Sequence, residues 1–533
     1  MGILSLIIFL PLLGALIILL TPRKFQNYYK HIALVFTLGQ LTLGGWLYLN
    51  FDQTLPGINK LSSFQWLEKL QWIRLDLAGL GQLEIDYLIG LDGLSMPMVL
   101  LSILIMLMAT VSSWNTRKST KAYFTLLLIL NTAVIGLFSA LDFFLFYIFY
   151  EVMLLPLYFL IGIWGGERRE YAAIKFFLYT LFGSVFMLLI IVGLYFSVIN
   201  PETGAHTFNM LHMMDPLNYV EHSFFAFYNN DITLLGLPIR TVGFLVLFIA
   251  FAIKVPTFPL HTWLPDAHVE APTPISIILA GILLKVGGYG ILRVCYGIFP
   301  DVIPQVSYYI GLIGVISILY GALLAIAQTH LKRMVAYASV SHMGFVILGI
   351  ASVTAEGISG AIFQMVSHGF LSAGLFFIVG MISDRTGDLN IYHYRGLASK
   401  LPRTAVYVGL LFFASLGMPG FSAFIGEAFV VIGSFNASEL DIDLPKWMAA
   451  AGALGILMSA IYFLWTYQRM YFGGLKLKGG KDWEMALTEI TTREQVVLLP
   501  IIALALILGI LPGILLDTIN SSVSQLVTYI FSL

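Results

Sequence analysis

Charged residues are scarce in this sequence. Only 11% of its 533 residues are Asp, Glu, Lys or Arg, while 59% are hydrophobic. A soluble domain carries about 25% charged residues, so this chain has too little charge to cover a water-exposed surface. The shortage excludes an ordinary soluble protein and indicates that apolar surface faces lipid. Because every backbone polar group within lipid needs a partner, the chain must cross the membrane as helices or as a closed barrel.

Cysteine is almost absent, since Cys295 is the only one. A single thiol excludes an internal disulfide, a thiolate zinc site and an iron–sulfur cluster held by cysteines of this chain. The net charge of −1 argues against nucleic acid as a partner. No positive charge precedes the apolar run at residues 3–20, so we expect a retained first helix and not a cleaved signal peptide.

Long apolar runs fill most of the chain, and their length favours helices over the shorter, alternating strands of a barrel. We therefore predict an all-α polytopic membrane protein. Windows of ~20 residues predict about fourteen transmembrane helices, at 3–20, 31–49, 93–113, 121–139, 142–163, 170–197, 239–265, 272–296, 305–327, 333–351, 359–382, 402–435, 447–472 and 494–515. The seventh contains Pro256, Pro259 and Pro265, and the twelfth contains Pro419-Gly420. We expect both to be broken helices.

The basic residues of the loops predict the orientation. With the N-terminus outside, the outward loops hold 6 basic residues, namely Lys60, Lys69, Arg74, Arg240, Arg293 and Lys446. The inward loops hold 19, namely Arg23, Lys24, Lys30, Arg117, Lys118, Lys121, Arg168, Arg169, Lys332, Arg333, Arg385, Arg395, Lys400, Arg403, Arg469, Lys476, Lys478, Lys481 and Arg493. This excess follows the positive-inside rule. Both termini are therefore expected outside, and the outward loops 50–92 and 199–238 are expected to pack as caps.

Three basic residues, Lys175, Lys254 and Lys285, and two acids, Glu151 and Glu427, remain within the predicted spans. A charge inside the membrane costs ~2.5–3.5 kcal/mol on insertion scales, so each is a candidate functional residue. The alternative is a static pair or a side chain that reaches the interface. That alternative fits Lys175 best, because it lies about one turn from the inner edge.

Lys254 immediately precedes the first proline of the broken seventh span, and Glu427 follows Pro419-Gly420 by a few residues. A proline frees carbonyl groups of the preceding turn, and these can hold a cation and water in a polar pocket. His342 and His368 lie mid-span on neighbouring predicted helices, and histidine titrates closest to physiological pH. A row of such groups is typical of a proton relay.

Two metal-based alternatives were weighed for the histidines. A haem site needs paired histidines that face each other across a bundle, and no second matched pair is apparent. His261, His268, Asp266 and Glu270 are close enough in sequence to suggest a metal. They lie in a proline-rich turn, however, where capping and loop hydrogen bonding are the better explanation.

The two broken spans are five helices apart. Because five is an odd number of membrane crossings, the second copy of a five-helix repeat has the inverted orientation in the membrane. This predicts two inverted repeats, an arrangement found in transporters. The expected units are residues 1–120 with helices 1–3 and an outward loop, 121–296 as the first repeat, 297–475 as the second repeat, and 476–533 as an inward loop and a fourteenth helix.

Two segments carry a resemblance to a known family. Phe149-Tyr150-Glu151-Val152-Met153-Leu154-Leu155-Pro156 resembles the glutamate-bearing fifth helix of the antiporter-like subunits of respiratory complex I. The stretch from Lys254 through Pro256-Thr257-Phe258-Pro259-Leu260-His261-Thr262-Trp263-Leu264-Pro265 to Leu284-Lys285-Val286-Gly287-Gly288 is similar to that family's longest signature. The family includes the M, L and N subunits and the related Mrp-type antiporter subunits. Glu427 resembles the M type, because the L and N types generally carry lysine there.

The resemblance implies roles for these residues. Glu151 would form an electrostatic switch with Lys175 or Lys254. Lys254, Lys285, His342 and His368 would carry protons along a central axis, and Glu427 would be the exit-side group. No cofactor is expected in this chain; flavin, iron–sulfur clusters and quinone would belong to partner subunits, and the L, N and K types and lipids would be its neighbours. The location would be the bacterial inner membrane, with both termini on the periplasmic side.

Two other functions remain open on the sequence alone. A cation/proton antiporter subunit of the Mrp type shares much of the pattern. A structural membrane scaffold predicts no line of charges at mid-membrane, so Lys254, Lys285 and Glu427 count against it.

Overall fold

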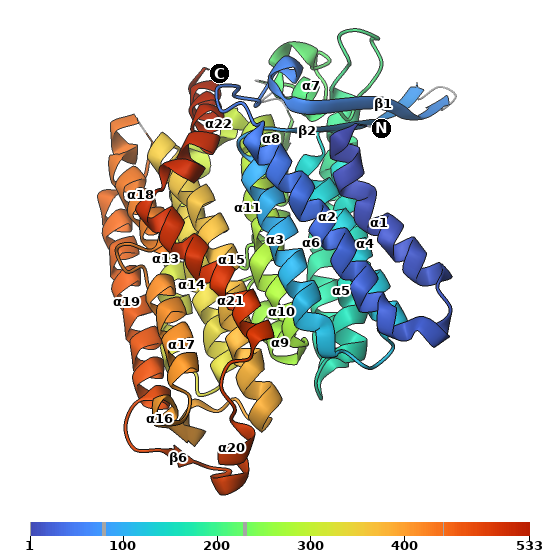
Figure 1. The fold of residues 1–533 in the computed structure, drawn as a ribbon. Helices are drawn as coiled ribbons and strands as arrows, with labels where there is room; N and C mark the ends of the chain where they lie inside the picture. Colours follow the sequence, from blue (N-terminus) through green and yellow to red (C-terminus); the bar gives the residue numbers. More distant parts are fainter. Residues whose placement is uncertain (1, 77–81, 228–231, 441, 533) are drawn as a thin grey trace.

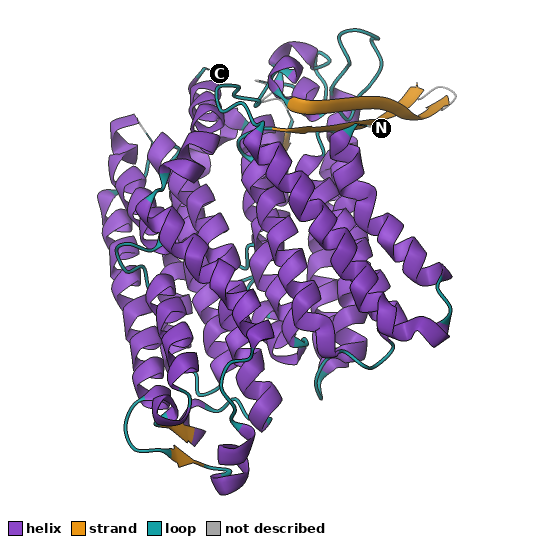
Figure 2. Cartoon of the chain, viewed as in Figure 1, coloured by secondary structure: helices purple, strands orange, loops and turns teal. Residues whose placement is uncertain are grey.

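The computed structural model describes residues 2–76, 82–227, 232–440 and 442–532. Helices form most of the part described, and they stand side by side with the chain ends at the same end of the bundle (Figures 1 and 2). Of the described helices, 13 are long and apolar enough to cross a membrane. The predicted all-α polytopic fold is confirmed.

Most predicted spans are continuous helices whose bounds lie within a few residues of the prediction. They are α1 (Ile3–Leu20), α2 (Tyr29–Leu49), α3 (Ser95–Ser112), α4 (Thr120–Ser139), α5 (Phe143–Trp164), α6 (Arg169–Ser197), α13 (Ile303–Ala327), α14 (Leu331–Ala351), α15 (Ala355–Thr386), α19 (Lys446–Tyr471) and α21 (Thr492–Ile510). The segment 402–435 divides into α17 (Pro402–Ser415) and α18 (Ser422–Asn436). The segment 239–265 gives α8 (Ile239–Lys254) and the start of α9 (Trp263–Glu270). Both predicted breaks are therefore present.

The helix between Thr273 and Ile298 is, with α15, one of the two most deeply buried spans among the described residues, and it is not a plain α-helix. Its α-helical parts are α10 (Thr273–Ile278), α11 (Leu284–Gly290) and α12 (Tyr296–Ile298). Two π-helical segments, η5 (Leu279–Leu283) and η6 (Ile291–Cys295), interrupt it. A π-helical segment carries one residue more per turn than an α-helix, which changes the direction of the side chains that follow.

Short elements cap the end of the bundle that holds the chain ends. A hairpin of β1 (Gln65–Asp76) and β2 (Gln82–Leu91) lies across it (Figure 1), and Glu68 of β1 accepts hydrogen bonds from Gly2 N and Ser5 N at 2.9 and 3.0 Å. The second predicted cap contains α7 (Met210–Met214) and the pair β3 (Thr233–Leu234) and β4 (Leu237–Pro238). At the opposite end lie α16 (Leu397–Lys400), α20 (Gly480–Ala486) and the two-residue strands β5 (Tyr394–Arg395) and β6 (Lys476–Leu477).

A further helix, α22 (Gly513–Phe531), follows α21 and was not predicted. α21 ends at Ile510, because Pro512 cannot continue the helix. The hydroxyl of Tyr529 on α22 donates to the carbonyls of Met214 and Gly297, at 2.5 and 3.1 Å. α22 therefore ties the cap to the helices below it.

Two basic residues that we assigned to outward loops are buried instead. Arg240 is 3% exposed and pairs with Asp301, and Arg293 is 1% exposed and pairs with Asp92. The prediction that Lys175, Lys254 and Lys285 are the only basic side chains drawn into the bundle is therefore wrong. Carboxylates from the neighbouring cap segments draw the two guanidinium groups inward, because a buried charge is retained where it is paired.

Candidate functional site

Lys254 is the last residue of α8, at the first break. Its side chain is fully buried, and its Nζ atom lies 4.7 Å from the ring centre of Tyr150 and 5.5 Å from that of Phe176. Among the described residues this nitrogen has no hydrogen-bond partner. The aromatic faces stabilise a cation by about 0.5–2 kcal/mol without binding its protons. The ammonium is thus held in place while its protons remain free for transfer.

Glu151 of α5 lies beside Lys254 but forms no ion pair with it among the described residues. Each contributes to the other's electrostatic environment, and the Ser184 hydroxyl of α6 lies beside the Glu151 carboxylate. Lys175 instead pairs with Asp266 of α9 at 2.6 Å. Of the two lysines considered for a switch with Glu151, the geometry favours Lys254, while Lys175 anchors α9 against α6.

Lys285 and His368 are in direct contact. Lys285 lies on α11 just after the π-helical segment η5, and its Nζ atom is 2.8 Å from Nδ1 of His368 on α15. The same ammonium donates to the carbonyl of Ala280 at 2.5 Å. Ala280 is part of η5, where the widened turn leaves a carbonyl open to a side-chain donor. The π-helical segment therefore orients Lys285 toward His368.

His342 continues the line beyond His368. The two rings are perpendicular, with centres 5.5 Å apart, and His342 Nε2 lies 3.2 Å from the hydroxyl of Tyr462 on α19. A cavity of about 10 Å³ adjoins both histidines and is also lined by Gln364 and Ser415. Such a volume holds about one water molecule. Gln364, Ser415 and His368 have polar atoms with no hydrogen-bond partner among the described residues, and these atoms suit a bound water molecule.

Glu427 lies in the second turn of α18, after the second break. Its carboxylate is fully buried, and neither oxygen has a hydrogen-bond partner among the described residues. Gly417, with φ +77°, packs so closely on this carboxylate that a Cβ there would clash with it. Tyr462 lies within electrostatic range of Glu427. Because Met418 in the break is 45% exposed, only the break separates Glu427 from the surface of the chain.

Close helix packing brings the first broken region against the buried helix that carries Lys285. A Cβ on Gly287 of α11 would lie 2.5 Å from the carbonyl of Phe251, so only glycine permits α8 to approach α11 this closely. Lys254 and Lys285 thereby lie on two packed helices. All six predicted site residues lie on elements that pack together, and direct contacts link Lys285, His368 and His342.

The histidines of the proline-rich turn form no metal site in the described residues, where no group of three or more metal-ligating side chains is found. His268 is fully buried, stacks on Phe376 with ring centres 4.2 Å apart, and has no hydrogen bond at either ring nitrogen. The expectation that His268 serves loop hydrogen bonding is therefore wrong. It lies within electrostatic range of Lys285 and Lys332.

Four side chains near the line were not predicted, namely Ser184, His268, Gln364 and Tyr462. Tyr462 carried no usable signal, because tyrosine is common in apolar spans and the chain has 26 of them. Gln364 could have been predicted, because it is a polar residue mid-span and lies four residues before His368. That spacing places both side chains on the same face of the helix.

Comparisons with known proteins agree with the resemblance read from the sequence. A family model described as NADH:quinone oxidoreductase/Mrp antiporter, TM, matches residues 140–475. The NADH-quinone oxidoreductase subunit M of Rhodobacter capsulatus is 37% identical over 535 residues, covering 99% of this chain and 96% of the relative. Its counterpart in Rickettsia bellii is 37% identical and covers 99% of both. A chain of respiratory complex I from Thermus thermophilus with bound NADH superposes with a TM-score of 0.79 at 28% identity and 99% coverage of both chains.

Proposed function

Since this chain belongs to the NADH:quinone oxidoreductase/Mrp antiporter family, we propose that it transfers protons across the membrane as the M-type subunit of a proton-translocating NADH:quinone oxidoreductase. The observation that carries the proposal is the run of contacts from Lys285 through His368 and His342 to Tyr462. Each of these groups can bind and release a proton. The run lies inside the bundle, where a titratable side chain without such a role is costly.

Proton uptake is assigned to the region around α9. His268 lies within electrostatic range of both Lys332, which donates to the Ala271 carbonyl at 2.6 Å, and the central Lys285. Its two free ring nitrogens can accept a proton on one side and release one on the other. We assign the other end of the route to Glu427, where the break at 416–421 leads to the surface.

Glu151 and Lys254 form the control element in this proposal. When Glu151 is charged it stabilises the ammonium of Lys254, and when the two groups separate that stabilisation is lost. Lys254 then passes its proton toward Lys285. The lack of an ion pair between Glu151 and Lys254 among the described residues supports a control element whose two charges can separate.

Redox chemistry is assigned to partner subunits, which would carry flavin, iron–sulfur clusters and quinone. The neighbours in the membrane would be the L, N and K types. We place the chain in the bacterial inner membrane, with the cap formed by β1, β2 and α22 on the periplasmic side. The loops at the opposite end carry most of the basic residues, in keeping with this orientation.

The M type is favoured over an Mrp-type antiporter by the identity to two subunit M relatives over 99% of this chain. Purification from native membranes separates the two. An NADH:quinone oxidoreductase subunit purifies with flavin and iron–sulfur absorbance, whereas an Mrp-type subunit purifies without them.

The proton-transfer role is tested by Glu151→Gln in the assembled complex. Glutamine keeps the shape but removes the charge, so Lys254 loses its anionic partner. We expect proton pumping into reconstituted vesicles to fall by about tenfold or more, because loss of a positioned proton-transfer group usually lowers a rate by at least that factor. Wild-type pumping by the assembled variant would show that Glu151 serves only as a hydrogen-bonding residue.

A further inference from the structure

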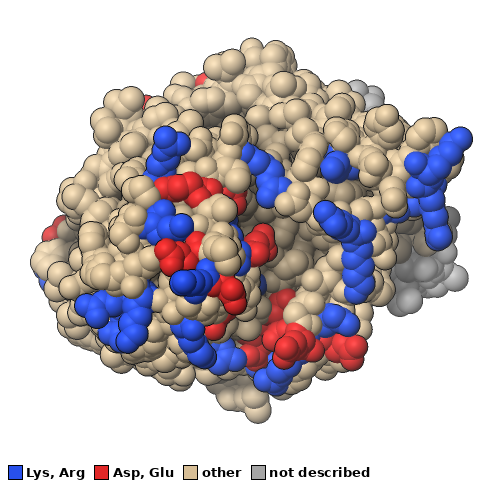
Figure 3. All heavy atoms as spheres, turned by 60° about the horizontal axis from the view of Figure 1, so that its bottom comes forward, with Lys and Arg blue, Asp and Glu red and all other residues tan. Residues whose placement is uncertain are grey.

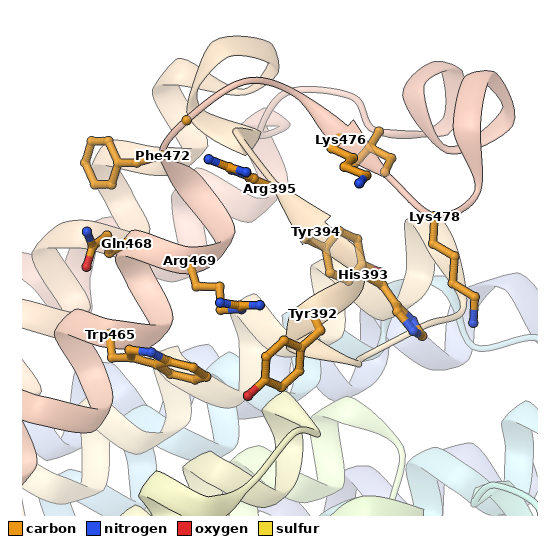
Figure 4. A pocket seen from close by; sticks show the side chains of 12 residues that line it. Tyr392, His393, Tyr394, Arg395, Trp465, Gln468, Arg469, Phe472, Lys476 and Lys478 are labelled. Carbon is orange, nitrogen blue, oxygen red and sulfur yellow. The ribbon is translucent and has the colours of Figure 1, made fainter.

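A large open pocket lies at the end of the bundle opposite the chain ends, away from the proposed proton route. Its volume is about 770 Å³. α19 forms one wall, and the segments around β5 and β6 form the other (Figure 4). The residues that line it are Tyr392, His393, Tyr394, Arg395, Trp465, Gln468, Arg469, Phe472, Gly473, Lys476, Leu477 and Lys478.

The pocket is rich in positive charge and is lined by no carboxylate. Among the described residues, Arg395, Arg469 and Lys476 form no ion pair. His393 pairs with Asp388 at 2.8 Å, and the same carboxylate also acts electrostatically on Lys478. At this end of the molecule Lys and Arg side chains lie among Asp and Glu side chains (Figure 3), but no carboxylate lines the pocket itself. Three cations thus remain without an anionic partner in one cavity.

The pocket is preformed by backbone contacts. β5 and β6 pair antiparallel, with Arg395 opposite Lys476. Gly473, with φ +91°, allows the Arg395 side chain to lie against the backbone, since a Cβ there would be 2.8 Å from its Nε atom. The Arg469 guanidinium lies 4.2 Å from the ring centre of Tyr392. These contacts hold both guanidinium groups in position without neutralising them.

An exposed apolar stripe of α19 leads directly into this pocket. Leu454, Leu457, Ile461 and Leu464 are 50%, 64%, 54% and 42% exposed. They recur every three or four residues, so they share one helix face. Trp465 and Phe472 follow at the edge of the pocket, as aromatic residues do where a membrane meets water. The exposed apolar stripe of α19 therefore ends at the positively charged pocket.

We propose that this pocket binds the phosphate headgroup of an anionic phospholipid, such as phosphatidylglycerol or cardiolipin, whose acyl chains lie along α19. Arg395 and Arg469 would donate to the phosphate oxygens through their planar guanidinium groups, with Lys476 adding a third charge. The apolar stripe continues directly into the basic pocket, and a phospholipid covers both with its acyl chains and its phosphate. An acidic peptide would bind the pocket but leave the stripe uncovered, so a lipid is favoured.

The test uses the assembled complex and two photoreactive lipids with the same diazirine-bearing acyl chain, a phosphatidylglycerol and a phosphatidylcholine. Cross-links are mapped by mass spectrometry to residues 462–478. We expect the phosphatidylglycerol to label this segment preferentially. In Arg395→Gln/Arg469→Gln the preference should fall by about tenfold or more, since each basic residue near an anionic lipid contributes about 1 kcal/mol.

Arg23→Gln/Lys24→Gln is the matched control, because it removes two exposed basic residues at the same end but outside the pocket; it should keep the preference. If the Arg double variant fails to assemble, Lys476→Gln alone should lower the preference by about fivefold. Equal labelling by both lipids would overturn the proposal. So would displacement by millimolar glycerol phosphate, which would indicate a site for a soluble phosphate, or protection by a neighbouring subunit, which would indicate a protein partner.

Discussion

The two broken helices carry opposite charges, and their geometry explains the difference. Lys254 is the last residue of α8, so it lies at the negative end of a helix dipole. Glu427 lies in the second turn of α18, and helical side chains lean toward the N-terminus. Its carboxylate therefore approaches the positive end of that helix, against Gly417. In this chain each charge therefore has the sign that the adjacent helix end favours.

The surroundings of the two charges also differ. Lys254 is enclosed by aromatic rings in the middle of the bundle, whereas Glu427 is separated from the surface only by the exposed turn at Met418–Gly420. In the proposed function, Lys254 exchanges protons with neighbouring groups inside the bundle, and Glu427 passes them out of the chain at the exposed break.

The largest effect is expected from Glu427→Ala. Alanine fits α18 well and removes the carboxylate that lies against Gly417 of the second break. We expect proton pumping by the assembled complex in vesicles to fall by more than about tenfold. Glu427→Asp, which keeps the acid, should retain most of the rate. An alanine variant that pumps at the wild-type rate would make Glu427 a structural residue.

Lys254 should show a smaller but still large effect, and arginine makes the test sharper than alanine alone. Lys254→Ala should assemble and pump about tenfold more slowly. Lys254→Arg keeps a cation at the end of α8 but cannot release its proton, so it should pump as poorly as alanine. If the arginine variant pumps normally, Lys254 supplies only a static charge.

Tyr462→Phe tests the last contact of the line, between Tyr462 and His342. It removes one hydroxyl, which lies 3.2 Å from His342, and a bridging water can replace part of its function. We expect a loss of about threefold to fivefold in pumping, on the scale of one hydrogen bond. The matched control is Tyr467→Phe on the same helix, whose hydroxyl donates to the Ala405 carbonyl at 2.9 Å. Equal losses in both variants would count against a place for Tyr462 in the line.

The smallest effect is expected outside the membrane, where Glu489 caps α17. Its carboxylate accepts from Arg403 N at 2.9 Å and from Thr404 N at 3.1 Å. Burial alone would raise the pKa of Glu489, but hydrogen bonds from Thr404 and these amides hold it below its ordinary value. Glu489→Gln should lower stability by about 1 kcal/mol and leave pumping unchanged.

This stabilisation should depend on pH with a defined sign. A carboxyl whose folded pKa is depressed stabilises the protein above its unfolded pKa, near 4.3, and loses that contribution as the pH falls through the folded value. The midpoint of thermal unfolding of the solubilised complex should thus be lower for Glu489→Gln than for wild type at pH 7, and the two midpoints should converge in acid. The exposed Glu484→Gln is the control; a pH-independent difference would exclude capping by the ionised form.

The spans, the breaks and the buried charges could be predicted because each leaves a local mark in the sequence: an apolar run, a proline or an isolated charge. What could not be predicted depends on contacts between distant segments. Arg293 is buried because Asp92 reaches it, and Tyr462 matters because His342 lies opposite. α22 escaped notice because it carries Asp517, Asn520 and several hydroxyl residues, and so lacks a long apolar run. The inverted symmetry of the two halves stays a prediction.

The position of α22 sets an order for folding during synthesis. The hydroxyl of Ser522 donates to the carbonyl of Pro56 at 2.5 Å and accepts from Gly93 N at 2.9 Å, while Tyr529 reaches Met214 and Gly297. These partners leave the ribosome hundreds of residues before α22 does, and a chain grows at about 5–20 residues per second. For tens of seconds the cap therefore lacks the contacts that α22 later supplies. A slow codon or a chaperone acting late in translation would therefore change how the cap segments made earlier in synthesis are stabilised.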